Sequence, residues 1–189
     1  MEASTEFSIL LSGFIVKLGV LAMWRILNTL ASPAALSLVL VLASLAILDA
    51  FLRLLSQSDL KKIVALTTVI EMNWLSMCYA LGDDNMVFLA NYLLVAHCFT
   101  TASEFFLVDC IARRYGTRDF WQVCGLWHST PLLWYATFVI NFITIGFPLS
   151  SIFFAKFLFL ATLLSTSTLL FVAYLLLFFL ALPLFFVRL

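Results

Sequence analysis

Charged residues are scarce in this sequence. Only 11% of its 189 residues are Asp, Glu, Lys or Arg, whereas 65% are hydrophobic. Soluble domains carry about 25% charged and roughly 45–50% apolar residues, so this chain lacks the polar side chains that would cover a water-facing surface. The composition excludes a soluble globular enzyme and a disordered chain, and it predicts an integral membrane protein.

An excess of positive charge is also missing. Ten Lys and Arg residues balance ten Asp and Glu residues, and the formal net charge is zero. Because a protein that binds nucleic acid needs a concentrated basic face, nucleic acid is excluded as a partner.

Cysteine is sparse and has no paired spacing. The four cysteines, Cys78, Cys98, Cys110 and Cys124, include no CxxC motif. Zinc sites, iron–sulfur sites and disulfide frameworks rely on such short spacings. The sequence also has no haem, flavin, phosphate-loop or nucleophile motif. We therefore expect no cofactor, metal site or redox active site in this chain.

Long hydrophobic runs, in contrast, are abundant. A helix needs about 20 mostly apolar residues to cross ~30 Å of hydrocarbon. The runs predict an all-α integral membrane protein, with 1–189 forming a single membrane domain of about six transmembrane helices. The predicted helices cover about 7–29, 34–54, 60–81, 85–112, 131–164 and 167–187.

The fifth predicted helix is too long for a single crossing. About 34 residues would extend ~50 Å at 1.5 Å per residue, and this run contains Gly146 and Pro148. Proline removes a backbone hydrogen bond and clashes with the preceding turn, so we predict a helix that is discontinuous at Pro148. Broken backbone at membrane depth is tolerated where it is packed in protein or lines a wet cavity, and such joints often mark ion pathways.

The loop charges differ between the two sides of the predicted membrane domain. One side has only Arg25, together with Asp83 and Asp84. The other has Arg53, Lys61, Lys62, Arg113, Arg114, Arg118 and Arg188. By the positive-inside rule, we expect both termini on this basic side, with Lys61 and Lys62 as anchors at headgroup level.

Five ionisable residues lie well inside the apolar runs: Lys17, Glu71, His97, Glu104 and Lys156. Each Lys or Glu at a helix centre costs about 2.5–3.5 kcal/mol on insertion scales, so these side chains must face one another, neighbouring helices or water. We predict that they form a proton relay. Alternatively, Glu71 and Glu104 are structural partners of the lysines, and His97 is a hydrogen-bonded packing residue.

A set of short segments provides a resemblance to a known family. In chain order they are EAST…SILL…VKLG…R from Glu2 to Arg25, SDLKKIVA…TTV from Ser58, AHCF…FF from Ala96, TRD…GL from Thr117, and the stretch from Pro148 to Phe157. Together they resemble the C-terminal part of the antiporter-like subunits of respiratory complex I (NADH dehydrogenase), most of all the subunit 4 (chain 4) branch. The resemblance covers about residues 2–165.

This resemblance implies roles for three of the buried residues. Lys17 falls on the mid-membrane lysine of the family's eighth helix, His97 on the histidine of its eleventh helix, and Lys156 on the ionisable position of its discontinuous helix. The subunit 4 branch usually has Glu at that last position. Glu71 stands where a histidine is usual, and Glu104 stands at an apolar position.

The resemblance also implies an assembly. We expect a proton-translocating membrane-arm subunit of NADH:ubiquinone oxidoreductase, with the flavin, iron–sulfur clusters and ubiquinone in partner subunits. The chain matches only the later part of the family's length, so we expect a C-terminal fragment of a split subunit whose N-terminal half is another chain. Other membrane-arm subunits and lipids are further expected partners.

The expected location is the mitochondrial inner membrane, with both termini on the matrix side. Two alternatives stay open: a subunit of a multisubunit cation/proton antiporter, and a structural membrane-arm scaffold that has lost pumping.

Overall fold

A computed structural model describes residues 4–30, 32–123 and 125–166, together with residues 168, 172 and 175. Within this part of the chain the regular structure is helical and no β-strand forms, which confirms the predicted all-α class. The helices are α1 (Thr5–Leu10), η1 (Leu11–Ile15), α2 (Val16–Leu30), α3 (Pro33–Ser56), α4 (Leu60–Leu81), α5 (Asp84–Tyr115), α6 (Leu126–Ser129), α7 (Pro131–Ile145) and α8 (Ser151–Thr166).

Local capping explains where two of the long helices begin. The Ser32 hydroxyl accepts a hydrogen bond from the Ala35 amide (3.2 Å), one residue before Pro33 opens α3. The Asp59 carboxylate accepts one from the Lys61 amide (2.9 Å) at the start of α4. Both side chains satisfy amides that have no partner inside the helix, and proline is well suited to the first helical position.

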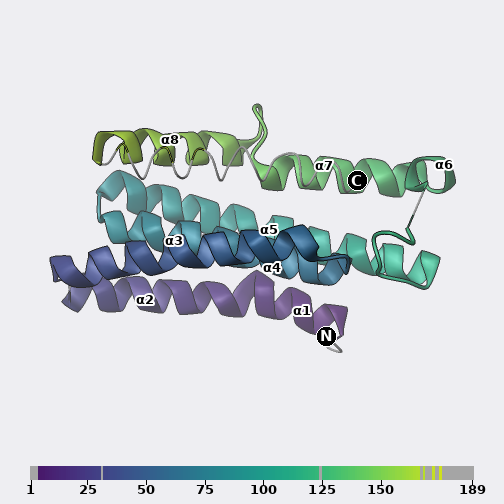
Figure 1. The fold of residues 1–189 in the computed structure, drawn as a ribbon, viewed down its shortest axis with the longest axis horizontal. Helices are drawn as coiled ribbons and strands as arrows, with labels where there is room; N and C mark the ends of the chain where they lie inside the picture. Colours follow the sequence, from purple (N-terminus) through teal and green to yellow (C-terminus); the bar gives the residue numbers. More distant parts are fainter. Residues whose placement is uncertain are drawn as a thin grey trace.

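The long helices lie side by side with similar axis directions (Figure 1). α4 packs against α3 and α5, and α2 packs against α4. On the other side of the bundle, α7 and α8 follow one another in a line, and both contact α5 (Figure 1). α5 also contacts α1 and η1. It therefore lies between the N-terminal helices and the two halves of the broken helix, α7 and α8.

The buried core lies where α4, α5 and α8 meet. Its fully buried members include Met77 and Cys78 of α4, Ala90 of α5, and Phe159 of α8. The rings of Trp74 and Phe159 pack with centroids 4.8 Å apart. In a lipid environment such contacts stabilise through close packing rather than through transfer from water.

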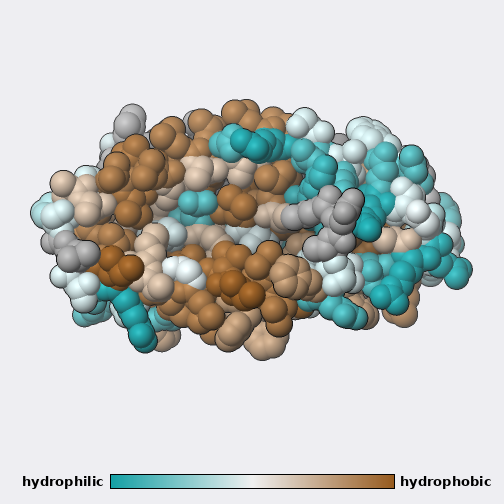
Figure 2. Space-filling view, turned by 90° about the horizontal axis from the view of Figure 1, so that it is seen from below, coloured by the Kyte–Doolittle hydropathy of each residue, from teal (hydrophilic) through white to brown (hydrophobic). Residues whose placement is uncertain are grey.

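Hydrophobic side chains also cover much of the outside. Leu42, Phe88 and Phe99 are each more than half exposed. Figure 2 shows hydrophobic residues over the middle of one face and hydrophilic residues gathered toward one end. An apolar band of this kind fits a surface that faces lipid.

Four helical stretches are long and apolar enough to cross a membrane: Thr5–Thr29, Pro33–Ser56, Leu60–Leu81 and Asp84–Tyr115. Their bounds agree with those of the first four predicted helices to within a few residues. The predicted sixth crossing, over 167–187, lies outside the described residues except at positions 168, 172 and 175.

The predicted break in the fifth helix is confirmed. α7 ends at Ile145 and α8 begins at Ser151, and the connection between them projects from their common line (Figure 1). Gly146 has a φ of 78° and Leu149 a φ of 89°. These left-handed conformations are incompatible with a continuing right-handed helix, and Pro148 lies between them.

The predicted basic side corresponds to one end of the bundle. There the segment before α4 pairs with the loop after α5, because the Leu60 amide donates to the Arg118 carbonyl (3.0 Å) and the Phe120 amide to the Ser58 carbonyl (2.9 Å). Lys62 is exposed, as an anchor should be, but Lys61 is only 1% exposed. Lys61 packs inward, where it interacts electrostatically with Asp59, Asp109 and Arg118.

Candidate functional site

The five predicted residues come from four helices and lie inside the bundle. Four of them are buried, with 2% exposure for Lys17, 4% for His97, 4% for Glu104 and 5% for Lys156. Glu71 is half-buried. The helices therefore enclose all or most of each side chain, as the cost of a charge in hydrocarbon would require.

Lys156 and Glu71 form a buried ion pair. The Lys156 ammonium donates to Oε1 of Glu71 at 2.6 Å, and the two side chains are only 7% and 14% exposed. A charge-assisted hydrogen bond of this length is a strong interaction where water is scarce. Glu71 is therefore the partner of a lysine, which was one of the alternatives for this residue.

The broken helix supplies the remaining partners of Lys156. Its ammonium also donates to the backbone carbonyls of Thr144 (3.2 Å) and Ile145 (3.3 Å) at the end of α7. The last carbonyls of a helix lack intrahelical partners and carry partial negative charge. The joint thus surrounds the cation of α8 with carbonyls from α7 and a carboxylate from α4.

Lys17 is positioned by a short π-helix. Its ammonium donates to the backbone carbonyl of Ser12. In η1 the Val16 amide donates to the Leu11 carbonyl, five residues back, so it does not take the Ser12 carbonyl as it would in an α-helix. No acidic side chain in the described part of the chain pairs with Lys17.

The π-helix also changes which face Lys17 occupies. The Ser8 hydroxyl donates to the Ser4 carbonyl (3.1 Å) and the Ser12 hydroxyl to the Ser8 carbonyl (2.7 Å), each at a spacing of four. Lys17 continues this series at a spacing of five. This π-helical turn was not predicted from the sequence. A signal for it is present, because the spacing of four between the serines is followed by a spacing of five to the lysine.

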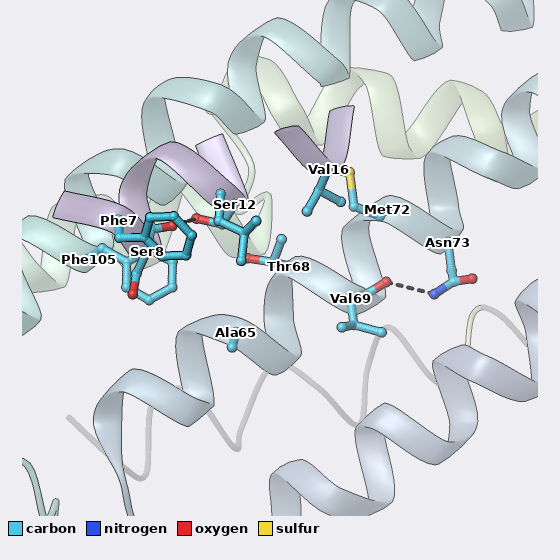
Figure 3. Close-up of a pocket in the computed structure, with 11 residues that line it drawn as sticks. Phe7, Ser8, Ser12, Val16, Ala65, Thr68, Val69, Met72, Asn73 and Phe105 are labelled. Carbon is cyan, nitrogen blue, oxygen red and sulfur yellow. Dashed lines mark hydrogen bonds between the residues drawn. The ribbon is translucent and has the colours of Figure 1, made fainter. Parts of the chain in front are cut away.

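A groove opens beside this serine series. It has a volume of about 280 Å³ and is lined mainly by apolar side chains. Figure 3 shows Ser8, Ser12 and Val16 on one wall and Thr68 and Met72 of α4 on the other. The groove thus lies between α4, which carries Glu71, and the N-terminal helical stretch that carries Lys17.

His97 and Glu104 lie two turns apart on α5. Among the described residues, neither ring nitrogen of His97 and neither carboxylate oxygen of Glu104 makes a well-formed hydrogen bond. Thr100 and Thr101 both donate to the His97 backbone carbonyl, at 3.3 Å and 2.6 Å. A hydrogen-bonded packing role for the His97 ring is therefore not supported. Buried polar groups without partners call for a physical reason, such as bound water or a moving proton.

These two residues connect the others electrostatically. His97 interacts with both Lys17 and Lys156. Glu104 interacts with Lys156, Glu71 and Thr144, while the Thr144 hydroxyl donates to the Ile140 carbonyl at 2.8 Å. The arrangement is a series in which α5 lies between a lysine on α2 and a lysine on α8.

No group of three or more His, Cys, Asp or Glu residues that could hold a metal ion is found in the described ranges. The five residues are Lys, Glu and His side chains, each of which can bind and release a proton. What this arrangement can do chemically is hold and transfer protons.

The family described as "NADH:quinone oxidoreductase/Mrp antiporter, TM" matches residues 1–181. Among curated proteins, the chain is 35% identical over 129 residues to NADH-ubiquinone oxidoreductase chain 4 of Paramecium tetraurelia, covering 68% of this chain and 27% of that protein. The chain spans about a third or less of the length of the first such relatives.

Two solved structures share the fold. A chain of the archaeal membrane-bound sulfane sulfur reductase, a respiratory membrane complex, superposes with a TM-score of 0.90 at 22% identity, over 98% of this chain and 39% of that one. A chain of the Mrp complex from Dietzia sp. DQ12-45-1b gives 0.88 at 22% identity, over 97% and 35%.

Proposed function

Because this chain belongs to the NADH:quinone oxidoreductase/Mrp antiporter transmembrane family, we propose that it is a proton-translocating part of the membrane arm of NADH:ubiquinone oxidoreductase. The observation that carries the proposal is the Lys156–Glu71 ion pair at the broken helix. This buried pair is linked electrostatically through His97 to Lys17.

In the proposed relay, Lys17 holds a proton near the middle of the membrane. The Ser12 carbonyl stabilises the charged form of Lys17 without neutralising it. Water or small side-chain movements then connect Lys17 to His97, whose ring nitrogens make no hydrogen bond within the part of the chain that the structure describes. His97 and Glu104 share one face of α5, so a proton can move along that face toward Lys156.

Lys156 is the proposed exit from this series. Its ammonium is held by Glu71 and by the two carbonyls of α7. In the proposed step, the ammonium moves away from Glu71 and these hydrogen bonds break. The contact with Glu71 therefore controls the release of the proton from Lys156.

The assembly around this chain is also part of the proposal. A Paramecium relative named NADH-ubiquinone oxidoreductase chain 4 supports membrane-arm partners, and the exposed apolar faces fit lipid and neighbouring helices. We propose that flavin, iron–sulfur clusters and ubiquinone lie in partner subunits, in the mitochondrial inner membrane, with both termini of this chain in the matrix. A separate chain equivalent to the relatives' N-terminal half stays a prediction, which co-purification tests.

A second candidate function is cation/proton antiport. The high structural similarity to a chain of the Mrp complex favours it, and the same buried groups serve either activity. A dependence of proton movement on Na⁺ or K⁺ rather than on NADH would support antiport. If the chain is a structural scaffold that has lost pumping, its proton movement would depend neither on Na⁺ or K⁺ nor on NADH.

The test of the proposed function is Lys156→Gln in the assembled complex. We expect a lower ratio of protons translocated to NADH oxidised, measured in sealed vesicles with a pH-sensitive dye. The matched control is Arg53→Gln, because Arg53 forms an exposed ion pair with Asp49 at 2.9 Å. An assembled Lys156→Gln complex that pumps as well as the control would rule out this relay.

A further inference from the structure

Gly146 lies directly beside the side chain of Lys156. A Cβ atom placed on Gly146 would be 3.2 Å from Cδ of Lys156, and 3.6 Å from both Cγ2 of Ile152 and the amide nitrogen of Phe153. A carbon–carbon separation of 3.2 Å is shorter than the ordinary optimum of about 3.5–4.0 Å. A Cβ at position 146 would therefore press against the lysine side chain, which would have to shift by a few tenths of an ångström.

The path of the lysine explains why this space matters. Lys156 starts on α8 and must pass the end of α7 to reach Glu71 on α4, while its ammonium meets the carbonyls of Thr144 and Ile145. Cδ is two bonds from the ammonium nitrogen. A displacement at Cδ is thus transmitted to all three of these hydrogen bonds.

Gly146 also ends α7 at a position that leaves the carbonyls of Thr144 and Ile145 available to accept hydrogen bonds from Lys156. Its φ of 78° is in the left-handed region, which glycine adopts without the steric cost that other residues meet. Its amide donates to the Ile143 carbonyl (3.0 Å), and the Phe147 amide donates to the Phe142 carbonyl (3.2 Å). Both amides bond upstream of Thr144 and Ile145, so the carbonyls of these two residues are left for Lys156.

We propose that Gly146 is a positioning residue for Lys156: the absence of a Cβ at the broken helix gives the lysine its path to Glu71 and to the free carbonyls of α7. This inference rests on the proposed function, because it assigns Gly146 a role through the proposed exit group. Gly146 has no titratable side chain, so it is not itself a member of the relay.

The chain offers matched controls for this proposal. Gly82 and Gly116 each have a φ of 71°, but a Cβ at either position would meet nothing within 4 Å. Replacement of Gly82 by alanine therefore imposes the same left-handed strain without any contact. Comparing positions 146 and 82 separates backbone strain from displacement of the lysine.

The experiment uses the assembled complex in sealed vesicles. We expect Gly146→Ala to lower the proton-to-NADH ratio by about twofold or more, because sub-ångström misplacement of a reacting group is costly. Gly82→Ala should leave the ratio unchanged. Gly146→Asn is the second variant, since asparagine tolerates the left-handed conformation but still carries a Cβ; it should assemble and show the same loss, while Gly82→Asn should not.

A double-mutant cycle tests whether the effect passes through Lys156. In a Lys156→Gln background, Gly146→Asn should lower the ratio no further. An additional loss in that background, or equal losses at positions 146 and 82, would overturn the positioning role. Normal pumping by Gly146→Asn together with a defect in Lys156→Gln would overturn this inference alone, whereas normal pumping by Lys156→Gln would overturn the proposed function.

Discussion

The Lys156 ammonium lies 2.6 Å from Oε1 of Glu71, a residue 85 positions earlier in the chain. This contact joins the second half of the broken helix to α4 across the interior of the bundle. Both side chains are nearly buried, so each charge depends on the other for compensation. The pair is thus a structural element as well as the proposed exit of the proton relay.

Removing one member of this pair should destabilise the protein more than removing both. In Glu71→Gln or Lys156→Met, an uncompensated charge stays in the bundle, and such losses amount to about 3–5 kcal/mol. The double variant Glu71→Gln/Lys156→Met removes both charges and should recover most of that loss. Thermal unfolding of the purified complex measures the difference.

The control for this cycle is the exposed pair Asp49–Arg53, whose side chains are 62% and 66% exposed. Exposed pairs contribute about 0–1 kcal/mol, so Asp49→Asn should change the midpoint of unfolding little. Equal shifts for Asp49→Asn and Glu71→Gln would contradict the view that Glu71 compensates a buried charge.

Replacement of Glu104, unlike replacement of Glu71, should not lower the thermal stability of the complex. Both carboxylate oxygens are buried without a well-formed hydrogen bond among the described residues, and an unsatisfied buried polar group costs about 1–3 kcal/mol. Glu104→Leu should therefore leave thermal stability unchanged or raise it. The same variant should lower the proton-to-NADH ratio if Glu104 carries protons, and a stable variant with normal pumping would remove Glu104 from the relay.

The π-helix should keep Lys17 on the face of the serine series. Deleting Phe14, a residue that is 62% exposed, removes one position from η1 and allows α-helical bonding to run through. Lys17 would then stand four residues after Ser12, and because each residue of an α-helix advances by about 100°, it would stay on the face that carries Ser8 and Ser12.

We expect the Phe14 deletion to retain proton translocation, whereas Lys17→Met lowers it. Phe14→Ala, which keeps the length of the helix, serves as the control, with assembly followed by native gel electrophoresis. A loss in the deletion variant as large as that of Lys17→Met would show that the π-helix does more than set the face of Lys17.

The start of α4 should depend on Asp59. Its carboxylate accepts a hydrogen bond from the Lys61 amide at 2.9 Å, and loss of such a cap costs about 1 kcal/mol. Asp59→Ala should lower the unfolding temperature measurably, whereas Asp59→Ser, which can also cap, should retain most of the stability. Equal losses in the two variants would indicate that the charge of Asp59, rather than its capping bond, stabilises this end of the bundle.

Much of the fold could be predicted from residue order alone. Hydropathy gave the first four crossings within a few residues, because a span is a local property of about 20 consecutive side chains. The break near Pro148 was equally predictable, since proline acts on its own backbone and on the turn before it. The burial of Lys17, His97, Glu104 and Lys156 followed from their places within apolar runs.

The pairing of these residues was not predictable in the same way. Nothing local to Glu71 indicates that Lys156 is its partner, and nothing in the hydropathy of Leu11–Ile15 indicates a π-helix. The inward position of Lys61 was also missed, because a lysine at the start of a span is ordinarily an interfacial anchor.

By itself, the sequence determined a membrane-embedded helical chain with a broken fifth helix and five ionisable residues kept from lipid. These properties depend on the chemistry of single residues and their close neighbours. Only the tertiary structure decided that Lys156 meets Glu71 and the end of α7, that Lys17 meets the Ser12 carbonyl, and that Gly146 leaves room for a lysine. The Lys156–Glu71 contact arises from packing between helices 85 positions apart in the chain, whereas the other two depend on the irregular backbone of the π-helix and of the broken helix, which hydropathy does not reveal.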